Sequence, residues 1–173
     1  MFGLDKHDCS IGNVNQRIER HGDERALAAD IKFSTTAGNV ILDSLEKGLK
    51  EALFRKPNRG EQQDIPGIGQ ALTAVKFPNL EPQRLSHEFS GYELTIDGML
   101  EASEPIFLAD VKLKKFVIEP LEGGSVGLTF TASANVEPSD LAELSEALIR
   151  EDVRVTLTPP AKQSGESEQQ EAA

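Results

Sequence analysis

The sequence predicts an α+β fold: a mainly antiparallel sheet of about six strands, a sandwich or a partly open barrel, packed with two helices. The first observation is that apolar residues recur at every second position between residues 92 and 134, with turn residues between the runs. Successive strand side chains point to opposite faces, so this period predicts a sheet with one buried and one solvated face. The second observation is an apolar stripe at spacings of three and four in residues 40–55, which is typical of an amphipathic helix.

The N-terminal segment, residues 1–24, is predicted to be an irregular arm. Glycine and asparagine interrupt any regular pattern there, at Gly12, Asn13, Asn15 and Gly22. A single α+β domain is expected over residues 25–160. Its first strand, residues 27–35, places every second residue on one face: Ala29, Ile31, Phe33 and Thr35.

Residues 40–55 are expected to form the first helix. Glu46 and Lys50 make a favourable i,i+4 pair, and Pro57 follows as a stop signal. Residues 58–70 are rich in glycine and polar residues and predict a loop. Residues 72–77 predict a short strand, and residues 81–90 a further loop.

A break in the alternation within residues 106–119 predicts a β-bulge. Val111 and Leu113 share one face, whereas Phe116 and Ile118 resume on the opposite parity after two lysines. A one-residue slip of this kind is typical of a bulge. The pair Gly123-Gly124 predicts a turn with positive φ that leads into a strand over residues 125–134.

The C-terminal part is expected to contain a helix, a strand and a tail. Ser139 is the predicted N-cap of a helix that ends at Arg150. The alternation of Val153, Val155 and Leu157 predicts the last strand. Residues 161–173 are polar and acidic and predict a disordered tail.

Composition limits the class of protein. The chain has 173 residues, a formal net charge of −11 and one cysteine, Cys9. One cysteine cannot form an internal disulfide, and no apolar run approaches the roughly 20 residues that span a bilayer. These features predict a cytoplasmic protein with no membrane partner. The net charge repels nucleic acid on average, but a local basic face remains compatible with it.

The sequence carries no legible catalytic motif, so we expect a protein that is not an enzyme and uses no cofactor. His7 and Cys9 are metal-ligating residue types, but no second cysteine completes a zinc spacing, and no metal site is predicted. His87-Glu88 opens a zinc-protease motif, yet Gly91 stands where the second histidine belongs.

A basic strand is the candidate binding site for single-stranded DNA. Its lysines would contact phosphates, and a neighbouring phenylalanine would stack on a base. Basic residues near the end of the first helix would extend this surface across the sheet. The alternative is that lysines on an exposed strand only block edge pairing. The candidate nucleic-acid-binding residues are Lys112, Lys114, Lys115, Phe116, Arg55, Lys56 and Arg59.

Several short stretches resemble an uncharacterised family of early-region proteins from tailed bacteriophages and prophages. They include Leu4-Asp5-Lys6-His7, His21-Gly22-Asp23-Glu24-Arg25, Leu53-Phe54-Arg55-Lys56-Pro57 and Gly91-Tyr92-Glu93-Leu94-Thr95-Ile96. The resemblance extends from residue 4 to about residue 160 and includes no active-site motif. It implies a phage protein of the host cell cytoplasm, some relatives being encoded near replication or recombination genes.

Three functions are therefore compatible with the sequence. The first is a non-enzymatic accessory protein of phage DNA replication or recombination that binds single-stranded DNA. The second is an acidic protein-binding module, such as an inhibitor of a host defence protein, because a negative surface can mimic nucleic acid toward a basic partner. The third is a virion component, a homo-oligomer that assembles through sheet edges.

Overall fold

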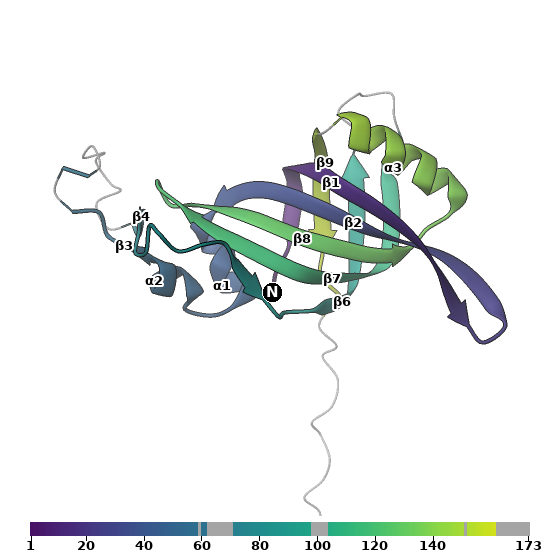
Figure 1. Cartoon of the computed structure of the whole chain (residues 1–173), viewed down its shortest axis with the longest axis horizontal. Coiled ribbons are helices and arrows are strands. Elements are labelled where there is room, and N and C mark those ends of the chain that lie inside the picture. The colour runs from purple at the N-terminus through teal and green to yellow at the C-terminus, as the bar shows by residue number, and fades with distance from the viewer. Residues whose placement is uncertain (59, 62–70, 98–103, 151, 162–173) are drawn as a thin grey trace, which may run out of the picture.

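The computed structural model describes residues 1–58, 60–61, 71–97, 104–150 and 152–161. Six of its strands close into an antiparallel barrel (Figure 1). The predicted mainly antiparallel sheet is confirmed, and it is a closed barrel rather than a sandwich or a partly open barrel. Each strand pairs antiparallel with its neighbour, and the last strand in the order pairs back with the first. The order around the barrel is β6 (Phe89–Asp97), β9 (Asp152–Thr158), β1 (Leu4–His21), β2 (Glu24–Gly38), β8 (Ser125–Asn135) and β7 (Ile106–Leu121).

The prediction of an irregular arm over residues 1–24 is wrong, because β1 occupies most of it. Its first part pairs with β9 and its second part with β2, so β1 joins two strands that lie far apart in the sequence. Gly12 sits where the register shifts between Ile11 and Asn13, and the strand continues past it. Gly22, with φ +66°, starts the two-residue turn of the β1–β2 hairpin. The barrel therefore begins before residue 25.

The alternating residues face the barrel interior, as the period of two predicts. Tyr92, Leu94 and Ile96 of β6 are buried, and so are the apolar residues of β8. An aromatic cluster fills the interior, and its members are Phe2, Phe33, Phe89, Tyr92, Phe116 and Phe130. Such pairs are worth about 0.5–1.5 kcal/mol each beyond their buried area. The Tyr92 hydroxyl donates a hydrogen bond of 2.8 Å to the carbonyl of Phe2, which ties the N-terminus to β6.

The predicted β-bulge in β7 is confirmed. The register of β7 against β8 shifts between Lys114 and Val117, and Lys115 has φ +56°. The bulge turns Phe116 and Ile118 to the same interior as Val111 and Leu113, and all four are buried. The turn at Gly123 and Gly124, both with positive φ, joins β7 to β8 as predicted.

The helix expected over residues 40–55 is broken into pieces. It comprises a 3₁₀ turn (Asn39–Ile41), α1 (Leu42–Leu45), α2 (Leu49–Leu53) and the two-residue strand β3 (Phe54–Arg55). Gly48, with φ +84°, and the extended Glu46 interrupt the helix. The predicted i,i+4 pair of Glu46 with Lys50 does not form, because Glu46 contacts His87 at 2.9 Å instead.

Two short strands complete the first half of the chain. β4 (Ala74–Val75) pairs with β3, which places the predicted strand over residues 72–77 in a separate two-stranded sheet. β5 (Gln83–Leu85) pairs with β7 beyond the bulge, in a segment where the sequence predicts a loop.

The third helix, α3 (Pro138–Arg150), connects β8 to β9 and packs against β1 (Figure 1). Its first residue is Pro138, so Glu137 occupies the N-cap, and the prediction of Ser139 there is wrong. The Asp140 carboxylate accepts a hydrogen bond of 2.7 Å from the Glu137 backbone N–H, as the third residue of a capping box does.

The predicted tail and most of the predicted loop cannot be compared with the structure. The tail over residues 161–173 lies, from residue 162 on, outside the described residues, as does most of the loop over residues 58–70. Within the described ranges, no helix has the length and apolar character needed to cross a membrane.

Candidate nucleic-acid interface

A cleft of about 740 Å³ lies on the outer face of the barrel. Strands β1, β2, β5, β7 and β8 each contribute to its lining. Most of the lining residues are polar, because outward-facing positions of these strands hold amide, hydroxyl and basic side chains. The residues are Asn13, Asn15, Asp30, Lys32, Arg84, Leu85, Lys115, Phe116, Val117, Thr129 and Thr131.

Three cations line this cleft without an acidic partner. Within the described part of the chain, the side chains of Lys32, Arg84 and Lys115 make no ion pair and no hydrogen bond. The bulge projects Lys115 outward, since its neighbour Phe116 turns into the core. Asp30 is the acidic member of the lining, and its charge is already compensated.

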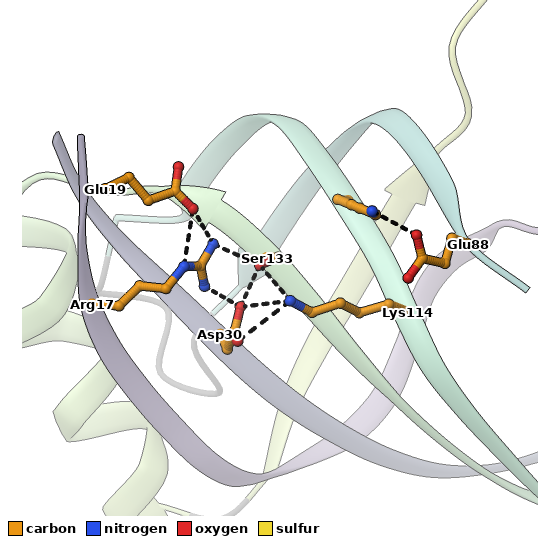
Figure 2. Close-up of polar contacts among 7 residues, drawn as sticks. Arg17, Glu19, Asp30, Glu88, Lys114 and Ser133 are labelled. Atoms are coloured by element: carbon orange, nitrogen blue, oxygen red, sulfur yellow. Dashed lines mark hydrogen bonds and ion pairs between the residues drawn. The ribbon is translucent and has the colours of Figure 1, made fainter. Parts of the chain in front are cut away.

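Asp30 of β2 belongs to a polar network that joins four strands, β1, β2, β7 and β8, on the outer face (Figure 2). Arg17 of β1 and Ser133 of β8 both donate hydrogen bonds to its carboxylate. The Lys114 ammonium of β7 lies 3.3 Å from Asp30 and 3.2 Å from the Ser133 hydroxyl. Arg17 also pairs with Glu19 at 2.5 Å. Two cations therefore face two carboxylates, with one hydroxyl at the centre.

The network stabilises the charged form of Asp30. Burial alone raises the pKa of this carboxyl, but the hydrogen bond from Ser133 and the charges of Lys114 and Arg17 outweigh burial and lower it below 3.8. Burial by itself lowers the pKa of the Arg17 guanidinium, but its hydrogen bond to Glu19 and the charge of Asp30 outweigh burial and raise this pKa overall. Asp30 thus stays ionised at neutral pH and contributes little free negative charge to the cleft.

A second hollow of about 470 Å³ borders the same network. Arg17, Lys114 and Ser133 belong to its lining, together with Glu19 of β1 and residues of β7 and β8. These further lining residues are Glu19, Ala109, Asp110, Lys112, Ala134 and Asn135. The outer face of β7 therefore carries one hollow on each side of the network.

The three lysines of the predicted basic strand lie in three different settings. Lys115 lines the cleft, Lys114 belongs to the network, and Lys112 pairs with Glu88 at 2.5 Å. The hydrogen bond from Lys112 and the lysine's charge lower the pKa of Glu88. The expectation that Phe116 stacks on a base is wrong, because its side chain is 0% exposed and packs on Phe2 and Phe130.

Of the predicted extension toward Arg55, Lys56 and Arg59, the described residues Arg55 and Lys56 do not line the cleft. Arg55 binds Glu61 at 2.8 Å and lines a different hollow. Hydrogen bonds from Arg55 and from a backbone N–H lower the pKa of Glu61 to about 2. Lys56 is exposed on the segment after β3, and Arg59 lies outside the described residues. Arg55 and Lys115 therefore line separate surfaces.

Sequence reasoning did not select Lys32 and Arg84. Lys32 lies on the outward parity of the predicted strand over residues 27–35, which is a weak signal by itself. Arg84 lies in a predicted loop, and its approach to Lys115 depends on β5 pairing with β7. Nothing in the local pattern of either segment indicates that pairing.

Cys9 and His7, the residues near the N-terminus that could act as a nucleophile or as metal ligands, contact groups unrelated to either role. Cys9 is buried in the barrel, and burial raises the pKa of its thiol to about 11, although a hydrogen bond from the Thr35 hydroxyl lowers it. The His7 ring lies 3.2 Å from the carbonyl oxygen of Thr36. Within the described ranges, no three His, Cys, Asp or Glu side chains gather as a metal site.

Comparisons of the chain with protein-family models, with curated proteins and with solved structures give no match. The resemblance to a family of phage proteins therefore stays a prediction.

Proposed function

We propose that the protein is a non-enzymatic accessory protein that binds the sugar–phosphate backbone of single-stranded DNA in the outer-face cleft. The observation that carries this proposal is the set of three unpaired cations, Lys32, Arg84 and Lys115, around one polar cleft. In a chain with net charge −11, these three cations meet at one cleft, while Lys112, Lys114 and Arg55 are neutralised by acidic partners. Phosphates bind to unpaired cations more readily because no ion pair has to break first.

The chemistry of the cleft favours backbone contacts over base contacts. Asn13, Asn15 and Thr129 offer neutral hydrogen-bonding groups, which suit phosphate and sugar oxygens. Phe116 presents no free ring to the cleft. We therefore expect weak preference for sequence and affinity that depends on salt, with a dissociation constant on the order of 10⁻⁴ to 10⁻⁶ M.

The test is fluorescence anisotropy with a labelled oligothymidylate of about 20 nucleotides at rising salt. Three phosphate contacts predict a slope of about −2 in a plot of log affinity against log salt, since each contact to a single strand contributes about −0.7. The variant K32E/R84E/K115E should lose binding. Its far-ultraviolet circular dichroism should match that of the wild type, because all three side chains are outward-facing.

The matched control is R20E/R25E/K47E, which changes the net charge by the same amount. These three exposed cations lie at the tip of the β1–β2 hairpin and between α1 and α2, away from the cleft lining. The control should bind DNA far better than the cleft variant. Equal losses in both variants, or no binding by the wild type at low salt, would reject the proposal.

A role in phage DNA replication or recombination, in the host cytoplasm, is the wider part of this proposal. The sequence resemblance to early-region phage proteins supports it. A double-stranded competitor of the same length in the anisotropy experiment tests the preference for single strands that such a role requires.

A protein-binding module is the second candidate, favoured by the exposed surface of α3. Glu143 and Ile149 are both exposed, and Ile149 is the most exposed of the large apolar side chains in the described part of the chain. An acidic helix with an exposed apolar residue suits a basic partner protein. A stoichiometric partner captured by the wild type but not by E143K/I149S would favour this function, provided that DNA binding is absent.

A further inference from the structure

Phe107 is an exposed aromatic residue on the outer side of β7, the strand whose other half lines the cleft. Its side chain is 58% exposed, and it lies on β7, the strand that also carries Lys112, Lys114 and Lys115. Of the described phenylalanines, Phe77 is comparably exposed, and it lies in the segment between β4 and β5. The exposure of Phe107 is costly, because a large apolar ring remains in water.

The pattern of burial along β7 places Phe107 on the outer side. Ile106 and Leu108, which flank it, are buried in the barrel, as are Val111 and Leu113 further along. Side chains between these positions point outward, since neighbouring strand residues alternate. Phe107, Lys112 and Lys115 therefore all point outward along β7.

We propose that Phe107 stacks on a base of a single strand that runs along the outer face of β7 from the cleft. This inference rests on the proposed function and adds the second contact of the same site. A strand rises about 3.3 Å per residue, so Phe107 lies on the order of 25 Å from Lys115. That span suits a bound segment of a few nucleotides, near the lower end of the roughly 4–16 nucleotides that single-strand sites on barrel folds occupy.

The two ends of this path carry different charged side chains, so one end suits phosphates and the other suits a base. The cleft end has three unpaired cations, whereas the other end has the carboxylates of Asp110 and Glu88 near Lys112. Carboxylates repel phosphates but do not prevent a base from stacking on an uncharged ring. The strand is therefore expected to turn its phosphates to Lys32, Arg84 and Lys115 and a base to Phe107.

The experiment uses a tryptophan in place of Phe107. The chain contains no tryptophan, so F107W creates a single indole fluorophore. Titration with unlabelled oligothymidylate should quench its fluorescence at the concentration at which anisotropy reports binding. The matched control is F77W, whose fluorescence should not change.

A second variant measures the contribution of stacking to affinity. F107A should bind the oligonucleotide about 5- to 140-fold more weakly than the wild type, which corresponds to loss of one base–aromatic contact of about 1–3 kcal/mol. F107Y should bind with nearly wild-type affinity. An oligonucleotide of abasic sugar–phosphate units should not distinguish F107A from the wild type, because it has no base to stack.

The outcomes separate this inference from the proposed function. Oligonucleotide binding that depends on Lys32, Arg84 and Lys115, with no quenching of F107W and full affinity of F107A, would overturn the role of Phe107 alone. Absence of binding by the wild-type protein would overturn both.

Discussion

Asp30 illustrates how one residue shapes the outer face. Its carboxylate accepts hydrogen bonds from Ser133 and Arg17, and Lys114 lies within ion-pair distance. The side chain is 18% exposed, so these contacts are only partly screened by water. Through these contacts Asp30 neutralises Arg17 of β1 and Lys114 of β7. The unpaired cations Lys32, Arg84 and Lys115 line the cleft on the same face.

Replacement of Asp30 by asparagine should lower the free energy of unfolding by about 1–3 kcal/mol at neutral pH, since charge-assisted hydrogen bonds are lost. The folded-state pKa of Asp30 is lowered, so its contribution is complete above the unfolded value of 3.8. It is lost as the pH falls through the lowered folded value. Urea unfolding at a series of pH values should show the difference between wild type and D30N shrinking in that acidic range.

Asp8 provides the control for this prediction. It lies 3.7 Å from Arg154, and its side chain is 82% exposed. D8N should change the free energy of unfolding by less than about 0.5 kcal/mol, because exposed pairs are strongly screened. A difference between D30N and the wild type that stays constant down to strongly acidic pH would contradict the role assigned to the Asp30 carboxylate.

At the scale of the element, the bulge in β7 determines which of its side chains face the core and which face solvent. Phe116 and Ile118 reach the interior because the strand gains a residue between Lys114 and Val117. The cost is a positive φ at Lys115, which for a residue with a side chain is about 1–2 kcal/mol. The same distortion projects the Lys115 side chain into the cleft, so one local feature serves both packing and binding.

Lys115→Gly should leave the free energy of unfolding unchanged or raise it by up to about 1 kcal/mol, because glycine adopts a positive φ without strain. The same variant should bind the oligonucleotide more weakly, since one of three cations is removed. Urea unfolding and anisotropy measure the two effects separately. Stability and binding should therefore change independently.

Lys112→Gly is the comparison, because Lys112 lies in β7 outside the positive-φ positions. Glycine in a strand interior costs roughly 0.5–1 kcal/mol, so this variant should be less stable than the wild type. An equal loss of stability in both variants would show that the φ of Lys115 is not strained.

At the scale of the whole molecule, β1 closes the barrel. It pairs with β9 over Leu4 to Ser10 and with β2 from Ser10 onward. The preceding Phe2 is fully buried and contacts Phe89, Phe116 and Phe130. Without this segment, β9 and β2 would each lose a partner and the aromatic cluster would lose a ring.

Deletion of residues 1–11 should therefore abolish cooperative unfolding, as measured by circular dichroism during heating. The segment contributes the buried side chains of Phe2, Leu4, Cys9 and Ile11, and each large one is worth about 2–5 kcal/mol. For the three large side chains this sum is roughly 6–15 kcal/mol, which is as large as the 5–15 kcal/mol by which proteins are usually stable. A synthetic peptide of residues 1–11 should restore a cooperative transition when added to the truncated protein.

A truncated chain with the melting temperature of the full chain would contradict this account. That result is also what the sequence-based expectation of an irregular arm predicts, so the deletion distinguishes the two.

Local patterns in the sequence were enough to identify some elements. The alternation in β6 and β8 indicates which residues are buried, and the slip after Leu113 indicates the bulge. The bulge itself implies that Phe116 faces the core, which conflicts with its expected role in base stacking. β1 was missed because its outward and hairpin positions are polar and include glycine and asparagine, which are typical of loops.

The candidate site could be predicted only in part. Lys115 was selected because it lies among other lysines, whereas Lys32 and Arg84 join it through pairings between distant strands. Which lysines are neutralised also depends on those pairings, since Asp30 meets Lys114 across two strand interfaces.

The sequence by itself determined the alternation in β2, β6, β7, β8 and β9, the inward and outward sets of side chains in those strands, and the turn at Gly123 and Gly124, because these depend on neighbours along the chain. Only the tertiary structure decided that the sheet closes through β1, and that three unpaired cations surround one cleft. The physical reason is that closure and charge pairing depend on strand registers, which bring together residues as far apart as Lys32 and Lys115.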